Sequence, residues 1–208
     1  MANQSQKKLD RLMEKSKELF WKYGYNGVSV DQIAKEAGIS KMTIYKHFSS
    51  KEDLFIQVLM GYAIYHTNKT MKIIEGKYHT FDKIESLYTV SIELSNQMPA
   101  ILTKDIMERP HVMNKLMAFK EEKSLSIWRY ILEDGIKKGE IRPLDVDFVS
   151  HLLWHIPKVF VDNKDYYTDE IKRGKLFKNL FDFLKYGLLG SEKSLQHYGE
   201  RESAVDSK

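Results

Sequence analysis

The chain of 208 residues has no cysteine, only four prolines and eleven glycines, and no apolar run near the ~20 residues of a membrane-spanning helix. Without cysteine there is no disulfide framework, thiol nucleophile or cysteine-ligated zinc. Few prolines and glycines disfavour a many-stranded sandwich. The polar N-terminus lacks the apolar segment of a signal peptide, so we expect a cytoplasmic protein without a membrane segment.

The residues that are present favour a globular, all-α protein. Hydrophobic residues make up 42% of the chain and aromatic residues 12%, which is enough for an ordinary core and disfavours disorder. The apolar residues recur at steps of three and four, as on one face of a helix, and no strand alternation or internal repeat is visible.

The charge is unevenly distributed along the chain. The net charge is +4, and residues 1–53 hold 10 basic and 7 acidic side chains, whereas the remainder is close to neutral. The stretch from Lys41 to Lys51 also contains Lys46 and His47 and has no acid. A short positive patch suggests a local anionic partner, although charge alone favours a solvated surface.

Capping signals divide the first fifty residues into short helices. An apolar stripe from Leu9 to Tyr23 predicts a first helix, which Gly24 ends. Ser29 begins a second helix with a capping-box pattern, and Gly38 ends it. Ser40 is the expected cap of a third helix over residues 41–47.

Two short helices joined by a tight turn and braced by a longer helix form a helix-turn-helix, whose second helix fits the DNA major groove. Ile44 and Phe48 can face inward and support that helix. Lys46 can donate to guanine, Met42 and Thr43 can contact bases, and hydroxyl, imidazole and ammonium groups can bind phosphate. The residues predicted to bind DNA are Ser29, Ser40, Lys41, Met42, Thr43, Tyr45, Lys46, His47 and Lys51.

The segment 27–54 resembles the N-terminal signature of TetR-type (TetR/AcrR) transcriptional regulators, most clearly in the run Ile44-Tyr45-x-His47-Phe48-x-Ser50-Lys51. The resemblance covers roughly residues 10–58. It implies an all-helical homodimer with a DNA-binding head and a larger body that senses a ligand. The family's usual phosphate contacts fall on Tyr45, His47 and Lys51.

The rest of the chain predicts a helical body. Helical patterns cover residues 51–75, 81–98, 101–108, 112–138, 145–163 and 169–189, and proline, glycine or asparagine breaks separate most of them. We therefore expect a head over residues 1–53, a ligand-binding and dimerisation body over 54–190 and a polar tail over 191–208.

The body is expected to pair two subunits and to hold a small molecule. The apolar faces of the last two helical patterns suit a four-helix interface, although they could serve only the subunit's own core. Aromatic residues suit an apolar or planar ligand, although each of them taken singly is more typical of plain core. The ligand candidates are Tyr62, His66, Tyr88, Trp128, Trp154 and His155.

A metal site is a weaker alternative. Asp147, His151 and His155 are spaced by four on one helix face, and imidazoles a turn apart can bind zinc. Three ligands strung along two turns rarely converge on one ion, so we predict no metal and no cofactor. The sequence has no phosphate-binding glycine loop and no nucleophile elbow, so it does not predict an enzyme.

Together these patterns predict a dimeric, sequence-specific transcriptional regulator that binds a palindromic operator on double-stranded DNA. It would be a repressor that a small, largely apolar or aromatic effector releases. One alternative is a DNA-bound architectural or protein-interaction factor without an inducer. Another is a ligand-binding or metal-dependent enzyme that merely carries the head.

Overall fold

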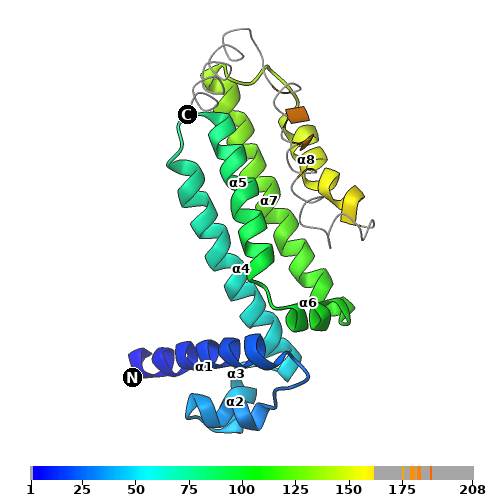
Figure 1. Cartoon of the computed structure of the whole chain (residues 1–208). Coiled ribbons are helices and arrows are strands. Elements are labelled where there is room, and N and C mark those ends of the chain that lie inside the picture. Colours follow the sequence, from blue (N-terminus) through cyan, green and yellow to red (C-terminus); the bar gives the residue numbers. More distant parts are fainter. Residues whose placement is uncertain (1, 162–174, 176–178, 181, 184–187, 189–208) are drawn as a thin grey trace, which may run out of the picture. The chain divides into compact units, whose positions relative to one another are not determined.

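The computed structural model describes residues 2–161, 175, 179, 180, 182, 183 and 188, with eight helices and no strand in this part of the chain (Figure 1). A few side chains inside the helices, that of Tyr88 among them, are outside the description. The helices are α1 (Ala2–Tyr23), α2 (Val30–Ala37), α3 (Lys41–His47), α4 (Lys51–Glu75), α5 (Thr80–Gln97), α6 (Ala100–Met107), α7 (Pro110–Lys138) and α8 (Val146–Val161).

The all-α prediction is confirmed for the described residues. Helices α3 and α4 have the predicted bounds, and α5 to α8 differ from theirs by at most two residues at either end. Helix α1 begins well before Leu9, the first residue of the predicted apolar stripe, because no glycine or proline interrupts the residues ahead of it. Most of the predicted helix over 169–189, and the whole predicted tail over 191–208, lie outside the described residues.

The chain forms two compact units, Met1–Lys69 with Ile92–Lys120 and Thr70–Ser91 with Glu121–Lys208, which we call unit 1 and unit 2. In unit 1, apolar side chains of the first three helices share one core with the start of α4, with α6 and with the start of α7. The predicted domain boundary at residue 53 therefore does not coincide with a unit boundary, and the division into head and body stays a prediction. Representative core residues are Leu12, Phe20, Ile33, Ile44, Leu54, Phe55, Leu102, Ile106 and Val112.

Unit 2 has its own apolar core, to which α5, α7 and α8 contribute. Its buried residues include Phe81, Ile84, Ile127, Trp128, Ile131, Leu132, Ile141 and Leu153. Gly135 of α7 allows a close approach, because a β-carbon there would lie 2.7 Å from the hydroxyl oxygen of Thr80. The beginning of α5 thus packs closely against the last turns of α7.

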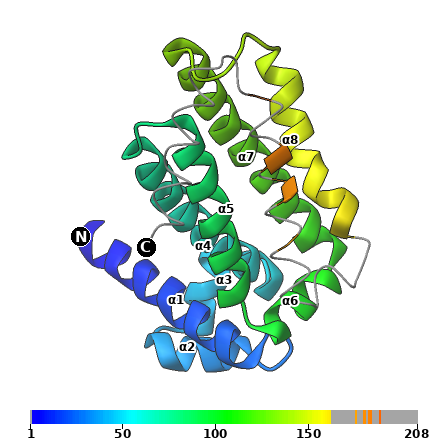
Figure 2. The ribbon, with the colours of Figure 1, turned by 45° about the horizontal axis from the view of Figure 1, so that its top comes forward.

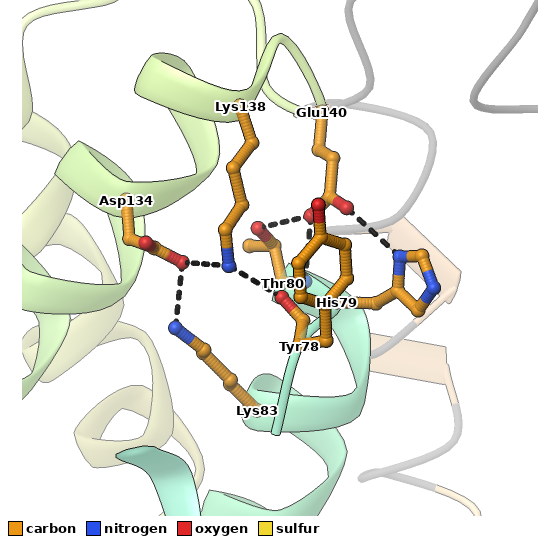
Figure 3. A network of polar contacts seen from close by, with 7 residues as sticks. All are labelled: Tyr78, His79, Thr80, Lys83, Asp134, Lys138 and Glu140. Carbon is orange, nitrogen blue, oxygen red and sulfur yellow. Dashed lines mark hydrogen bonds and ion pairs between the residues drawn. The ribbon is translucent and has the colours of Figure 1, made fainter. Parts of the chain in front are cut away.

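Glu140 holds the beginning of α5 in place by capping this helix (Figure 3). Its carboxylate accepts hydrogen bonds from the backbone N–H of Thr80 at 2.7 Å and from the Thr80 hydroxyl at 2.6 Å. The second carboxylate oxygen lies 2.9 Å from Nδ1 of His79. A negative charge at a helix N-terminus also interacts favourably with the helix dipole.

A buried lysine lies beside this cap (Figure 3). The Lys83 side chain is only 2% exposed, and its ammonium lies 2.6 Å from Asp134 and over the ring of Tyr130. Lys138 shares the same carboxylate at 2.7 Å and donates to the carbonyl of Tyr78. The paired carboxylate offsets the cost of holding the Lys83 charge away from water.

Both carboxylates remain ionised to lower pH than usual. Burial raises the pKa of Glu140, but the hydrogen bonds from Thr80 and His79 outweigh burial and hold the pKa below its ordinary value. Burial likewise raises the pKa of Asp134, and the hydrogen bonds from Lys138 and Lys83 more than reverse that effect. A carboxylate with a lowered pKa stabilises the fold above its ordinary pKa, and this contribution is lost as the pH falls through the lowered value.

We predict that Glu140→Ala lowers the free energy of unfolding at pH 7 by about 2 kcal/mol, because the charged acceptor of the Thr80 bonds is lost. The penalty should shrink as the pH falls below ~4, since the wild-type carboxylate is then protonated as well. Urea unfolding at several pH values measures both the penalty at pH 7 and its decrease at lower pH. Glu133→Ala is the control, because Glu133 is exposed on α7, the helix that ends two residues before Glu140. Equal penalties for the two variants would contradict the assignment.

Candidate nucleic-acid interface

The predicted caps set the ends of the two short helices in unit 1. The Ser29 hydroxyl accepts from the backbone N–H of Gln32 at 3.1 Å, and the Ser40 hydroxyl accepts from that of Thr43 at 3.1 Å. Between them Gly38 has a φ of +68°, in the left-handed region that favours glycine. The tight turn between α2 and α3 therefore follows from the residues identified in the sequence.

Helix α3 is held from behind and exposed in front. Ile44 is 1% exposed and Phe48 is 8% exposed, so both lie in the core of unit 1, as predicted. On the outer face Met42 is 81% exposed and Tyr45 is 47% exposed. Lys46 and His47 are exposed too, so α3 presents apolar, hydroxyl and cationic groups together.

The α3 surface is less purely cationic than its sequence suggests. Lys41 forms an exposed ion pair with Asp31 of α2 at 2.9 Å, so part of its charge is offset. Lys46 has no acidic partner among the described residues, and this lysine is the better candidate for a free cation on α3. Thr43 is half-buried, with its hydroxyl 2.8 Å from that of Ser40.

Lys51, which is predicted to contact phosphate, also makes contacts inside unit 1. Its ammonium donates to the carbonyl oxygen of Tyr25 at 2.6 Å and lies 4.0 Å from the centre of the Tyr25 ring. Burial lowers the pKa of Lys51, and the charge of Arg109 lowers it further. Lys51 thus ties the start of α4 to the turn after α1, and its contact with DNA stays a prediction.

The same turn is clamped by α6, which lies beside the C-terminal end of α1 (Figure 2). The buried carboxylate of Asp105 accepts from the backbone N–H of Tyr25 at 2.6 Å and from the Asn26 amide at 3.1 Å. Arg109 binds Asp105 at 3.3 Å, donates to Asn26 at 2.6 Å and covers the Tyr25 ring at 4.0 Å. We call these four residues the Asp105 clamp.

Sequence reasoning missed the clamp because its partners lie about 80 residues apart. The only local signal is an aspartate inside the apolar pattern of α6, between Leu102 and Ile106. Gly24 reflects the same contact, since a β-carbon there would lie 2.5 Å from the Asp105 carboxylate. The turn after α1 and α6 are therefore fitted closely to each other.

The aromatic ligand candidates are divided between the two units. The rings of Tyr62 and His66 lie 4.2 Å apart in unit 1, tilted by 56° to each other, and Tyr62 also contacts Trp21 of α1. Trp128 is packed in the unit 2 core, and Trp154 is half-buried. The Tyr88 side chain lies outside the description. Their roles as ligand contacts stay predictions.

The three weak metal candidates have separate partners. Asp147 pairs with Arg129 at 2.6 Å, and Nδ1 of His151 lies 2.8 Å from the Asp147 backbone carbonyl. His155 is exposed and lies 3.9 Å from Glu121. Among the described residues, no group of three His, Asp or Glu side chains could hold a metal ion. No described helix is both long and apolar enough to cross a membrane.

Comparison with known proteins agrees with the helix-turn-helix geometry. Residues 12–58 match the family model of bacterial regulatory proteins of the tetR family. The chain is 25% identical to the HTH-type transcriptional repressor KstR2 of Mycobacterium tuberculosis over 158 residues, 74% of this chain and 79% of that repressor. It is 26% identical to the HTH-type transcriptional regulator UidR of Escherichia coli K12 over 157 residues, with the same shares covered.

Solved structures share the fold. The transcriptional regulator FadR of Bacillus subtilis, in complex with stearoyl-CoA, has a TM-score of 0.60 and 22% identity, over 86% of this chain and 98% of that one. A TetR transcriptional regulator from Chloroflexus aurantiacus has a TM-score of 0.64 and 22% identity, over 91% of this chain and 100% of that one.

The helix-turn-helix and the family match identify residues 12–58 as a DNA-binding region of the tetR family of bacterial regulatory proteins, and the named relatives are HTH-type transcriptional regulators. The sequence-based assignment to this family is confirmed. Its relatives are regulators rather than enzymes.

We predict that Asp105→Asn lowers the free energy of unfolding by about 3 kcal/mol, because Arg109 would lose the charge that compensates it in a buried site. Glu108→Gln, at the C-terminal cap of the same helix, is the matched control. It breaks the Lys104–Glu108 pair, which has the same four-residue spacing but is exposed, and should cost less than ~0.5 kcal/mol. If denaturant unfolding gave the same loss of unfolding free energy for both variants, the structural role of the clamp would be contradicted.

Proposed function

We propose that the protein is a dimeric repressor that places one α3 helix of each subunit in the DNA major groove and that a small apolar effector releases. The observation that supports the proposal is the arrangement of side chains on α3. This helix has two buried supports, Ile44 and Phe48, and an outer face with exposed groups that bind bases and phosphates.

Each exposed group has a distinct role in this proposal. Lys46 donates to guanine, and Met42 packs against a thymine methyl group, so these two side chains set the sequence preference. Tyr45 and His47 bind phosphate and set the position of the helix. Ser29 and Ser40, at the starts of α2 and α3, lie where backbone N–H groups also favour phosphate.

Pairing of two subunits through α8 is supported by exposed apolar side chains. Phe148 is 65% exposed and Leu152 is 44% exposed, and these residues are one turn apart on α8. Phe183, in the last helical pattern of the sequence, is 65% exposed as well. Large apolar groups gathered on one face are typical of a protein interface, and a two-fold dimer would prefer a palindromic operator.

Release by an apolar effector is supported by the relatives. KstR2, a relative of this chain, is named as a repressor, and the FadR structure with the same fold holds stearoyl-CoA. Trp154, half-buried on α8, would suit an apolar ligand of this kind. An effector lowers DNA affinity only through the difference in its own affinity for the two states, typically ~1–3 kcal/mol.

For DNA binding we predict two different defects. Tyr45→Phe should weaken binding to all duplexes by about fivefold, because one hydrogen bond to phosphate is lost. Lys46→Ala should change the preferred base at one position of each half-site. Selection of duplexes from a random pool, followed by binding titrations, measures both. Unaltered binding and preference in both variants would show that α3 is not the recognition helix.

For dimerisation we predict that the double variant Phe148→Ser, Leu152→Ser sediments as a monomer at micromolar concentration, where the wild type is a dimer. The control is Met107→Ser, which removes an equally exposed apolar residue from α6. The pairing surface would lie elsewhere if the double variant remained dimeric.

A further inference from the structure

Helix α1 carries cations that lie outside the helix-turn-helix itself. Lys7, Lys8 and Arg11 are exposed in its N-terminal half, and no acidic residue precedes Asp10. The Asp10 carboxylate accepts a hydrogen bond from Gln6. The N-terminal half of α1 is therefore distinctly positive.

The two flanks of α1 have different neighbours within unit 1. Successive helix residues are about 100° apart, so Lys8 and Arg11 lie on one flank of the buried stripe and Lys17 on the other. Lys17 lies over the rings of Trp21 and Tyr62 at 5.5 Å and 5.1 Å, which places its flank against α4.

The flank of Arg11 faces the turn between α2 and α3. A β-carbon built on Gly38 would lie 3.7 Å from each of Cζ, Nη1 and Nη2 of Arg11. Equal distances to these three atoms mean that the flat face of the guanidinium rests on the glycine. The Arg11 guanidinium therefore lies beside the turn that precedes α3.

The charges of Lys8 and Arg11 are not offset in the described part of the chain, where neither residue has an acidic partner. Lys15, on the same flank, differs because it binds Glu18 at 2.7 Å. Lys41 of α3 pairs with Asp31. Arg11, Lys8 one turn before it on α1, and Lys46 of α3 are thus exposed cations without an acidic partner in the part of the chain that the structure describes.

We propose that Lys8 and Arg11 form a second DNA-binding strip, which binds backbone phosphates of the duplex whose major groove α3 enters. This inference rests on the proposed function of α3. Phosphate oxygens match the planar donor edges of a guanidinium. The strip adds affinity that does not depend on base sequence.

The test is the salt dependence of DNA binding by the full-length protein. The probes are a duplex selected by the wild type from a random pool and an unrelated duplex of equal length. We expect Lys8→Gln, Arg11→Gln to weaken binding to both duplexes by a similar factor. The slope of log affinity against log salt should fall by about one for each phosphate contact removed.

Two variants serve as controls. Lys17→Gln removes the same charge from the opposite flank of α1 and should leave the slope within ~0.3 of the wild type, as it makes no phosphate contact. Arg11→Lys keeps the charge and should preserve the slope while weakening affinity, because the bidentate fork is lost. Thermal melting of each variant confirms that α1 remains folded.

The outcomes separate this inference from the proposed function. If the double variant has the slope of Lys17→Gln while Tyr45→Phe weakens binding, α3 binds DNA and the α1 strip does not. If the wild type itself fails to bind either duplex at low salt, the proposed function fails first.

Discussion

The structure depends on how Ile44 and Phe48 anchor a seven-residue helix. So short a helix has little stability of its own, because nucleation costs more than a few hydrogen bonds return. Burial of these two side chains, with the Ser40 cap and the left-handed Gly38, holds α3 in place. Substitutions on the outer face of α3 therefore leave its packing intact, whereas substitutions of Ile44 or Phe48 do not.

The same core extends beyond the three helices of the head. Leu102, Ile106 and Val112 pack in the cluster that holds Ile44, and Asp105 binds the turn after α1. The position of the DNA-binding helices is thus set partly by residues that follow them by more than fifty positions. Lys51 and Arg109 each lie 4.0 Å from the centre of the Tyr25 ring, so charged side chains hold this turn inside unit 1.

Local features of the fold were predictable from sequence, and long-range ones were not. Caps such as Ser29 and Ser40 act on neighbours three residues away, so their spacing alone indicated the helix ends. The Asp105 clamp and the Asp31–Lys41 pair join residues that only the fold brings together. The flat seat of Arg11 on Gly38 likewise has no signal in the sequence pattern.

The central claim is that two α3 helices enter successive major grooves on one face of the duplex. Hydroxyl-radical footprinting of the wild type on a selected duplex tests it most directly. The account predicts two protected segments whose centres are separated by about one helical turn, ~10 base pairs, or a multiple of it. A single protected segment, or protection unrelated to the helical repeat, would contradict it.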